Sequence, residues 1–313
     1  MAAGPRIVFL DAASVEDLPV FRQFAELGDF TSYSLTPPDR LVERARDAEV
    51  VIINKVKLTA EVIEQLPALK LICVAATGVN NVDKDAAAER GIPIRNVADY
   101  STESVAQLTI TALIAMAMDL PYLNDAVYSG EYSEAKDFTM WRHPFYELKG
   151  LTFGIVGMGN IGRRVAELAT AFGARVVYHS ISGTDHDVPY PRLELNELLE
   201  TSRVVSIHCA LSEQTKGLIG YAELQRMSDS AYLVNVARGG IVVEADLVRA
   251  IDAGEVAGAA VDVFTEEPLP ADHPYLGVKN RHRLLLTPHI GWASVEARTT
   301  LLERIMDNIR EGW

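Results

Sequence analysis

Short runs of β-branched and aliphatic residues alternate with helical patterns along the whole chain, and this alternation restricts the fold more than any other feature. The runs are almost entirely apolar, whereas strands of a half-exposed antiparallel sheet alternate apolar and polar residues. Apolar strands separated by helices are typical of parallel sheets that helices cover on both faces. The predicted strands span residues 7–10, 50–53, 71–75, 153–156, 175–178, 204–208, 231–236, 257–263 and 284–287. The sequence therefore predicts an α/β fold with doubly wound parallel sheets.

Length and charge limit the possible partners. A chain of 313 residues is long enough for about two domains, each with its own core. With 29 basic and 43 acidic side chains, the formal net charge is −14. Nucleic acid is not an expected partner, because neutralising phosphates requires clustered Lys and Arg. An anionic small molecule must then be held by a local site.

Cysteine usage and hydropathy suggest where the protein works. Cys73 and Cys209 both lie in apolar runs, so we expect buried thiols in a reducing compartment rather than a disulfide scaffold. The first apolar run is short and reaches Asp11, which is unlike a signal peptide. The most apolar longer stretch, residues 105–118, contains polar residues and is shorter than the roughly 20 residues of a membrane span. We expect a cytoplasmic protein with no membrane partner.

Two segments near the middle of the chain bear on its organisation. A predicted closing strand, residues 92–97, is followed by a long apolar helix over residues 101–120, which we expect to cross between domains. Residues 125–148 then turn irregular and aromatic. A loop of this length covers a cleft, makes a subunit contact, or packs as an extended arm, and the sequence leaves these alternatives open.

A glycine-rich turn joins the predicted strand at residues 153–156 to a helix. In G-x-G-x-x-G, Gly157 makes the turn, Gly159 lets the backbone approach a pyrophosphate, and Gly162 lets the helix pack on the strand. The phosphates would meet free N–H groups around Asn160 and Ile161. Strand, glycines, helix and second strand fall within one unit of about 30 residues, which predicts a dinucleotide site.

The end of the second strand bears on which dinucleotide binds. His179 stands where NAD-specific proteins usually place an Asp or Glu for the ribose 2′-hydroxyl. Without that carboxylate, the 2′-phosphate of NADP is not repelled. However, no arginine follows between His179 and Pro191, and Asp185 and Asp187 disfavour an anion. The cofactor is therefore predicted to be NAD or NADP.

Polar residues also follow three further predicted strands, the usual position of ligand-contacting groups in open α/β sheets. Arg238 can hold a carboxylate with two parallel hydrogen bonds, although a helix cap or a surface ion pair would also explain an arginine there. His289 can exchange a proton near neutrality, although a structural histidine is the alternative. Glu267 could hydrogen-bond the imidazolium of His289 and keep it protonated. Together these three residues predict a catalytic group.

The ordered blocks G-M-G-N-I-G, N-V-A-R-G-G, D-V-F-T-E-E-P and T-P-H-I-G-W resemble the D-isomer-specific 2-hydroxyacid dehydrogenase family over nearly the whole chain. The resemblance implies a Rossmann dinucleotide-binding domain, residues 100–288, inserted in a flavodoxin-like substrate domain of residues 1–99 and 289–313. It implies Arg238, Glu267 and His289 as catalytic residues. Residues 54–56, residues 100–107 and Trp141 resemble the glycerate dehydrogenase, or hydroxypyruvate reductase, branch most.

The resemblance also implies a ligand set. The backbone N–H groups of Gly78 and Val79, with Arg238, would hold the substrate carboxylate, while Lys55 and Trp141 would shape the pocket or simply pack. No metal site is expected. The cofactor contacts implied are Gly157, Gly159, Asn160, Ile161, Gly162, His179, Ser180, Cys209, Val236, Ala237, Asp262, His289 and Gly291.

The reaction implied is reduction of a small 2-oxo acid, hydroxypyruvate or glyoxylate, by a homodimeric oxidoreductase. Hydride passes from the nicotinamide to C2 while protonated His289 supplies a proton to the oxygen. A dinucleotide-sensing binding protein of the same fold is an alternative, as is a dehydrogenase for phosphite or for another 2-hydroxy acid. Formate oxidation is disfavoured, because that branch lacks a Glu at the position of Glu267.

Overall fold

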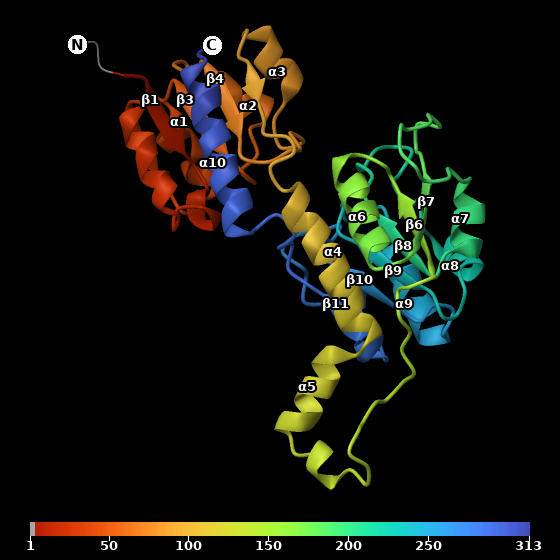
Figure 1. Cartoon of the computed structure of the whole chain (residues 1–313). Helices are drawn as coiled ribbons and strands as arrows, with labels where there is room; N and C mark the ends of the chain where they lie inside the picture. Colours follow the sequence, from red (N-terminus) through yellow and green to blue (C-terminus); the bar gives the residue numbers. More distant parts are fainter. Residues whose placement is uncertain (1–3) are drawn as a thin grey trace. The chain divides into compact units, whose positions relative to one another are not determined.

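The computed structural model describes residues 4–313 and contains two compact units (Figure 1). Unit 1 comprises Met1–Ser101 and Ala293–Trp313, and unit 2 comprises Thr102–Trp292. We expected the boundaries at residues 99/100 and 288/289. The second boundary lies later in the chain because the N–H groups of Ile290 and Gly291 donate to the carboxylate of Asp262, which keeps His289 and its neighbours in unit 2.

Unit 1 is built on a parallel sheet with the strand order β2-β1-β3-β4-β5, the order of flavodoxin-like folds. Side chains of the three short helices pack on one face of this sheet, while α10 and the 3₁₀ helix Pro19–Glu26 cover the other. The elements are β1 (Arg6–Phe9), β2 (Asp29–Ser32), α1 (Leu41–Ala45), β3 (Val50–Ile53), α2 (Ala60–Glu64), β4 (Leu71–Val74), α3 (Lys84–Glu89), β5 (Ile94–Arg95) and α10 (Val295–Arg310).

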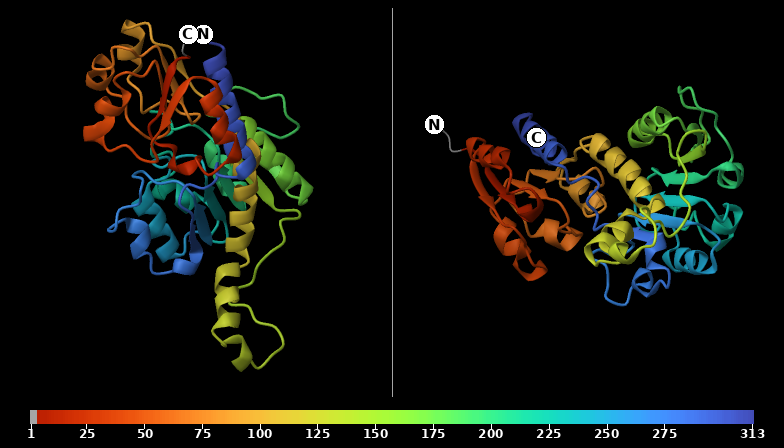
Figure 2. Two further views of the ribbon diagram at one scale, coloured as in Figure 1. Left: turned by 90° about the vertical axis from the view of Figure 1, so that its left-hand side faces the viewer. Right: turned by 60° about the horizontal axis from the view of Figure 1, so that its bottom comes forward.

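Unit 2 is a six-stranded parallel sheet with the order β11-β10-β9-β8-β6-β7. Figure 2 shows α4 and α6 on one face and α7, α8 and α9 on the other, each side with its own apolar core. Its elements are α4 (Thr102–Ala117), α5 (Leu120–Tyr128), β6 (Thr152–Val156), α6 (Asn160–Ala171), β7 (Arg175–His179), α7 (Leu195–Thr201), β8 (Val204–Ile207), α8 (Tyr221–Arg226), β9 (Tyr232–Asn235), α9 (Glu244–Ala253), β10 (Gly258–Val261) and β11 (Leu284–Leu286). The prediction of two doubly wound parallel α/β units is confirmed.

Three local expectations need correction. Strand β2 was not predicted, because it lies at the sheet edge and its sequence DFTS has no buried apolar run. The helix expected over residues 101–120 is α4, which ends three residues earlier, at Ala117; a second helix, α5, begins at Leu120 after a 58° bend where Asp119 adopts a left-handed φ of 56°. Helix α5 and a 3₁₀ turn at Tyr132–Glu134 also occupy part of the segment expected to be irregular.

Helix α4 lies in the core of unit 2, where Ala106 and Leu113 are fully buried. Within residues 4–313, no single helix is long and apolar enough to cross a membrane; α4 and α5 reach that length and composition only as a bent pair. Helix α5 and the loop after it project away from the sheet of unit 2 (Figure 1).

Candidate active site

The predicted site residues of unit 2 lie along one edge of its sheet, because the carboxyl ends of parallel strands share an edge. Gly157 follows β6, His179 ends β7, and Cys209 comes shortly after β8. Arg238 follows β9 and Asp262 follows β10, while His289 comes shortly after β11. The strand order therefore separates the glycine loop and His179, on one side of β8, from the predicted acid–base residues on the other.

The glycine loop has the backbone geometry that a phosphate requires. Gly157 has a φ of +99°, and a Cβ there would lie 2.7 Å from the backbone nitrogen of Cys209. A Cβ on Gly162 would lie 2.2 Å from the carbonyl oxygen of Gly157, so only glycine lets α6 approach β6 this closely. At Gly159, which precedes the first residue of α6, a Cβ would meet nothing within 4 Å. The loop and helix start thus fit a pyrophosphate.

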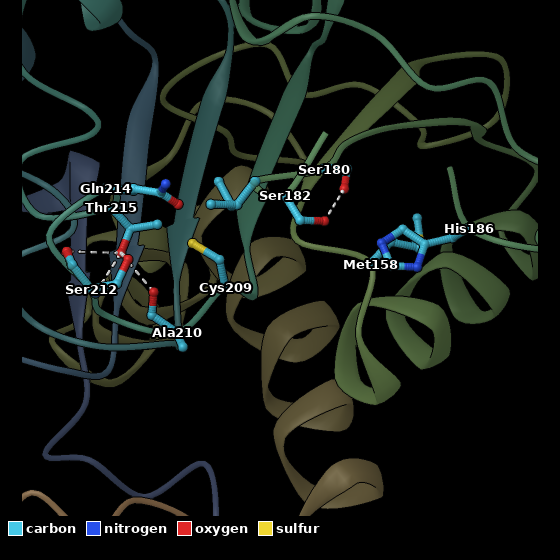
Figure 3. A pocket seen from close by; sticks show the side chains of 10 residues that line it. Met158, Ser180, Ser182, His186, Cys209, Ala210, Ser212, Gln214 and Thr215 are labelled. Carbon is cyan, nitrogen blue, oxygen red and sulfur yellow. Dashed lines mark hydrogen bonds between the residues drawn. The ribbon is translucent and has the colours of Figure 1, made fainter. Parts of the chain in front are cut away.

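A pocket of about 280 Å³ adjoins this loop (Figure 3). Its walls come from Met158 of the glycine loop, the segment after β7 and the segment after β8. Ser180 and Cys209, two of the expected cofactor contacts, line it, and burial raises the pKa of the Cys209 thiol to about 11. The other lining residues are Ile181, Ser182, His186, Ala210, Ser212, Gln214 and Thr215. The pocket fits a nucleoside of a dinucleotide.

His179 is partly buried, and its Nδ1 lies 3.1 Å from the carbonyl oxygen of Leu193, so Nδ1–H donates there. Two arginines outside the segment considered in the sequence also approach this region. Arg163 donates to the carbonyl oxygen of Asp187 at 3.1 Å, and Arg192 pairs with Asp185 at 2.6 Å. Of the two aspartates that disfavour an anion, the carboxylate of Asp185 is paired with Arg192, whereas Arg163 contacts only the backbone of Asp187. Both NAD and NADP stay compatible with the site.

The structure brings Glu267 and His289 together. His289 Nδ1 lies 2.9 Å and 2.7 Å from the two carboxylate oxygens of Glu267. The side chain of His289 is 22% exposed and that of Glu267 is 27% exposed. A ligand can therefore reach the pair, while water competes only in part for its hydrogen bonds. Because Nδ1–H donates to Glu267, the other ring nitrogen, Nε2, is the one available for proton exchange.

Asp262 holds the backbone around His289. Its carboxylate is buried and accepts hydrogen bonds from Thr287 Oγ1 at 2.5 Å, Ile290 N at 2.9 Å and Gly291 N at 2.8 Å. Its carbonyl oxygen accepts from His289 N at 2.8 Å. His289 is held in a left-handed conformation with a φ of 54°. This network presents the imidazole to Glu267 and explains why residues 289–292 stay with unit 2.

Arg238 lies on a turn that rests on the segment leading to Glu267. A Cβ on Gly239 would lie 2.0 Å from the carbonyl carbon and oxygen of Phe264, so this contact requires glycine. Asn235 shapes the turn by accepting from Ala237 N and donating to Arg238 O. The Arg238 side chain is exposed and donates to the carbonyl oxygen of Ala237, and within the described range 4–313 it forms no ion pair. An exposed, unpaired guanidinium can bind an incoming anion.

Unit 1 carries the predicted substrate-binding loops at the corresponding edge of its own sheet. Asp11, which follows β1, accepts from the backbone nitrogens of Asn54, Lys55 and Val56 at 2.7, 2.5 and 2.8 Å. Asn81 donates to the carbonyl oxygens of Asn54 and Val56. These contacts shape the loop that carries Lys55, whose side chain is exposed, while Gly78 and Val79 on the loop after β4 are half-buried.

Asp11 and Asn81 were not among the predicted site residues. The signal for Asp11 was available, because it is a carboxylate directly after an apolar strand, like Asp262. The contacts of Asn81 cross two loops, and only the folded chain shows them.

Comparison with known proteins places these observations in a family. The sequence profile described as "D-isomer specific 2-hydroxyacid dehydrogenase, NAD binding domain" matches residues 110–291. The chain is 36% identical over 282 residues to the hydroxypyruvate reductase of Blautia hydrogenotrophica, covering 89% of this chain and 86% of that protein. It is 37% identical over 306 residues to the glycerate dehydrogenase of Methylorubrum extorquens, covering 97% and 95%.

Among solved structures, the fold is similar to an NADPH-dependent glyoxylate/hydroxypyruvate reductase from Sinorhizobium meliloti in complex with NADP and malonate. The TM-score is 0.81 at 26% sequence identity, and the alignment covers 98% of this chain and 92% of that one.

Proposed function

Because the chain belongs to the D-isomer specific 2-hydroxyacid dehydrogenase family, a family of NAD(P)-dependent oxidoreductases, we propose that it reduces hydroxypyruvate or glyoxylate to the D-2-hydroxy acid. The observation that supports this proposal best is the contact between His289 Nδ1 and the Glu267 carboxylate at the strand edge that also carries the glycine loop. A dinucleotide sensor of the same fold does not need an acid–base pair open to a ligand.

In the proposed reaction, each residue acts on a defined part of the substrate. The bound nicotinamide supplies the hydride. Arg238 binds the substrate carboxylate and polarises the carbonyl, and the N–H groups of Gly78 and Val79 bind the carboxylate. His289 donates the proton on Nε2 to the carbonyl oxygen, and Glu267 stabilises the imidazolium before transfer. Charge arranged in advance around a developing alkoxide is the main source of rate enhancement.

The test is a panel of 2-oxo acids, each assayed with NADH and with NADPH by loss of reduced-cofactor absorbance. Arg238→Ala is expected to lower kcat/KM by about 10²–10³ while leaving dinucleotide affinity nearly unchanged. His289→Ala is expected to lose the pH-dependent limb of the rate profile. Weak dinucleotide binding with normal turnover in Arg238→Ala contradicts the assignment. Tight dinucleotide binding with no turnover on any acid favours the sensor.

We also propose that the enzyme is a homodimer and that it works in the cytoplasm. The projecting segment of unit 2 exposes large apolar side chains, including Tyr128 at 85%, Phe138 at 86% and Trp141 at 57%, and such clusters are typical of interaction surfaces. Light scattering should give twice the chain mass for the wild type and a smaller species for Tyr128→Asp/Phe138→Asp. Both cysteines are free, as in proteins of reducing compartments, and cell fractionation tests the location.

A further inference from the structure

Behind the Glu267–His289 pair lies a second acid–imidazole pair that is more deeply buried. His273 Nε2 and Glu244 Oε2 are 3.0 Å apart, and their side chains are 5% and 14% exposed. Removing an ion pair or a charge-assisted hydrogen bond from water is costly, so such a pair is a weak source of stability. Its contacts point to a different use.

Glu244 is the first residue of α9, and its second carboxylate oxygen, Oε1, accepts from the backbone N–H of Thr265 at 2.8 Å. The preceding N–H, that of Phe264, donates to Glu267 Oε1 at 3.0 Å. The adjacent backbone N–H groups of Phe264 and Thr265 therefore bind two carboxylates, that of Glu267 in the site and that of Glu244 behind the segment. Residues 265–268 are exposed, so little apolar burial anchors this part of the segment. The Glu244 carboxylate is thus a principal anchor for the orientation of Glu267.

His273 holds Glu244 in one orientation. Its Nδ1 accepts from the N–H of Tyr275 at 3.2 Å, which leaves the proton on Nε2 and makes Nε2–H the donor to Glu244. The rings of Phe264 and Tyr275 lie 6.1 and 4.9 Å from the imidazole, centre to centre. Hydrogen bonds thus link Tyr275 N, His273, Glu244 and Thr265 N. The backbone between Thr265 and Phe264 connects them to the hydrogen bonds of Glu267 and His289.

We propose that Glu244 and His273 are positioning residues that orient Glu267 toward His289. This inference rests on the proposed function, because it assigns them their effect through the acid–base pair of that reaction. The contacts of His289 with charged residues are those of Nδ1 with Glu267 and of its backbone N–H with the carbonyl oxygen of Asp262. A Glu267 that is less well held stabilises the imidazolium of His289 less, so the rate of proton transfer and its pH dependence should both respond to the placement of Glu267.

The principal test is Glu244→Gln. The glutamine oxygen can still accept from Thr265 N–H, but its amide N–H₂ must face the Nε2–H of His273, donor against donor, since Tyr275 N–H occupies Nδ1. We expect kcat/KM at neutral pH to fall at least tenfold and the basic limb of its pH profile to move down by about one unit, with the dinucleotide Kd within twofold. Asp246→Asn is the matched control, because Asp246 also lies in the first turn of α9 and accepts a backbone N–H, that of Tyr221. Its pH profile should match the wild type.

A second pair of variants keeps the proposal testable if Glu244→Gln does not fold. His273→Gln can accept from Tyr275 N–H and donate to Glu244, so it should retain the wild-type pH profile, whereas His273→Leu should shift it as Glu244→Gln does. In a Glu267→Gln background, adding Glu244→Gln should shift the profile no further. If Glu267→Gln alone leaves the profile unchanged, the acid–base assignment in the proposed function is wrong. If Glu267→Gln changes it and neither Glu244→Gln nor His273→Leu does, only the positioning inference is overturned.

Discussion

Replacing Asp262 by asparagine tests whether one buried carboxylate builds the segment that carries His289. Its three donors, Thr287 Oγ1, Ile290 N and Gly291 N, lie on both sides of His289 in the chain. Asparagine has nearly the same shape, so no cavity forms. The substitution removes the charge and turns one acceptor into a donor.

The size of the effect follows from the contacts. The one oxygen left on the asparagine side chain can keep the bonds to Thr287 and Ile290, but as neutral bonds each is weaker by about 1 kcal/mol than a bond to a charged acceptor. Gly291 is buried, and its N–H would face an amide N–H₂, which costs about 1–3 kcal/mol for an unpaired buried donor. We expect unit 2 to lose roughly 3–5 kcal/mol of unfolding free energy. We also expect kcat/KM to fall by about 10–100-fold as His289 shifts.

Urea unfolding followed by circular dichroism, together with steady-state kinetics on the same preparations, measures both effects. Asp185→Asn is the control, since that side chain is 80% exposed in its surface ion pair and its loss should change stability by less than about 0.5 kcal/mol. If Asp262→Asn unfolds at the wild-type urea concentration with wild-type kcat/KM, the carboxylate does not hold this segment and the reasoning fails.

Three further predictions use other parts of the chain. Burial lowers the pKa of His208 from 6.5 to about 3, so between these pH values the unfolded chain binds a proton that the folded chain does not. His208 should therefore contribute up to about 1.4 kcal/mol per pH unit to the loss of stability as the pH falls through this window. Urea titrations at several pH values should give a shallower slope for His208→Asn than for the wild type; equal slopes contradict this. Gly162→Ala places a methyl group 2.2 Å from Gly157 O and should lower both the melting temperature and the dinucleotide affinity. In Gly159→Ala the new methyl group meets no protein atom within 4 Å, so this variant should lower only the dinucleotide affinity. Fluorescence titration measures the affinity of both variants. His179→Asp restores the carboxylate usual in NAD-specific proteins and should raise the NADPH Kd at least tenfold relative to that of NADH; an unchanged ratio means that His179 does not face the 2′-position.

The local parts of the fold could be predicted because their causes are local. The run Val50–Ile53 consists of β-branched residues, is buried at every position and favours an inner strand. Gly157, Gly159 and Gly162 specify a turn whose geometry depends on adjacent backbone atoms. The strand Asp29–Ser32 was not predicted. It lies at the sheet edge, and an edge strand does not need an apolar sequence. The bend at Asp119 is followed by Pro121 in the first turn of α5, and a proline at this position is a local signal for the start of a new helix.

The sequence by itself determined the fold class, the glycine loop, the family, and which polar residues follow the strands. Only the tertiary structure decided which of those residues meet. Glu267 and His289 are 22 positions apart in the chain, and Glu244 and His273 are 29 apart, yet each pair lies within hydrogen-bonding distance. The physical reason is that strand order and loop path set these distances, and neither can be inferred from the hydrophobic periodicity of any one segment. The contacts of Glu244, His273 and Asp11 behind the loops depend on the same long-range placement, so the residues that orient the site were the hardest to predict.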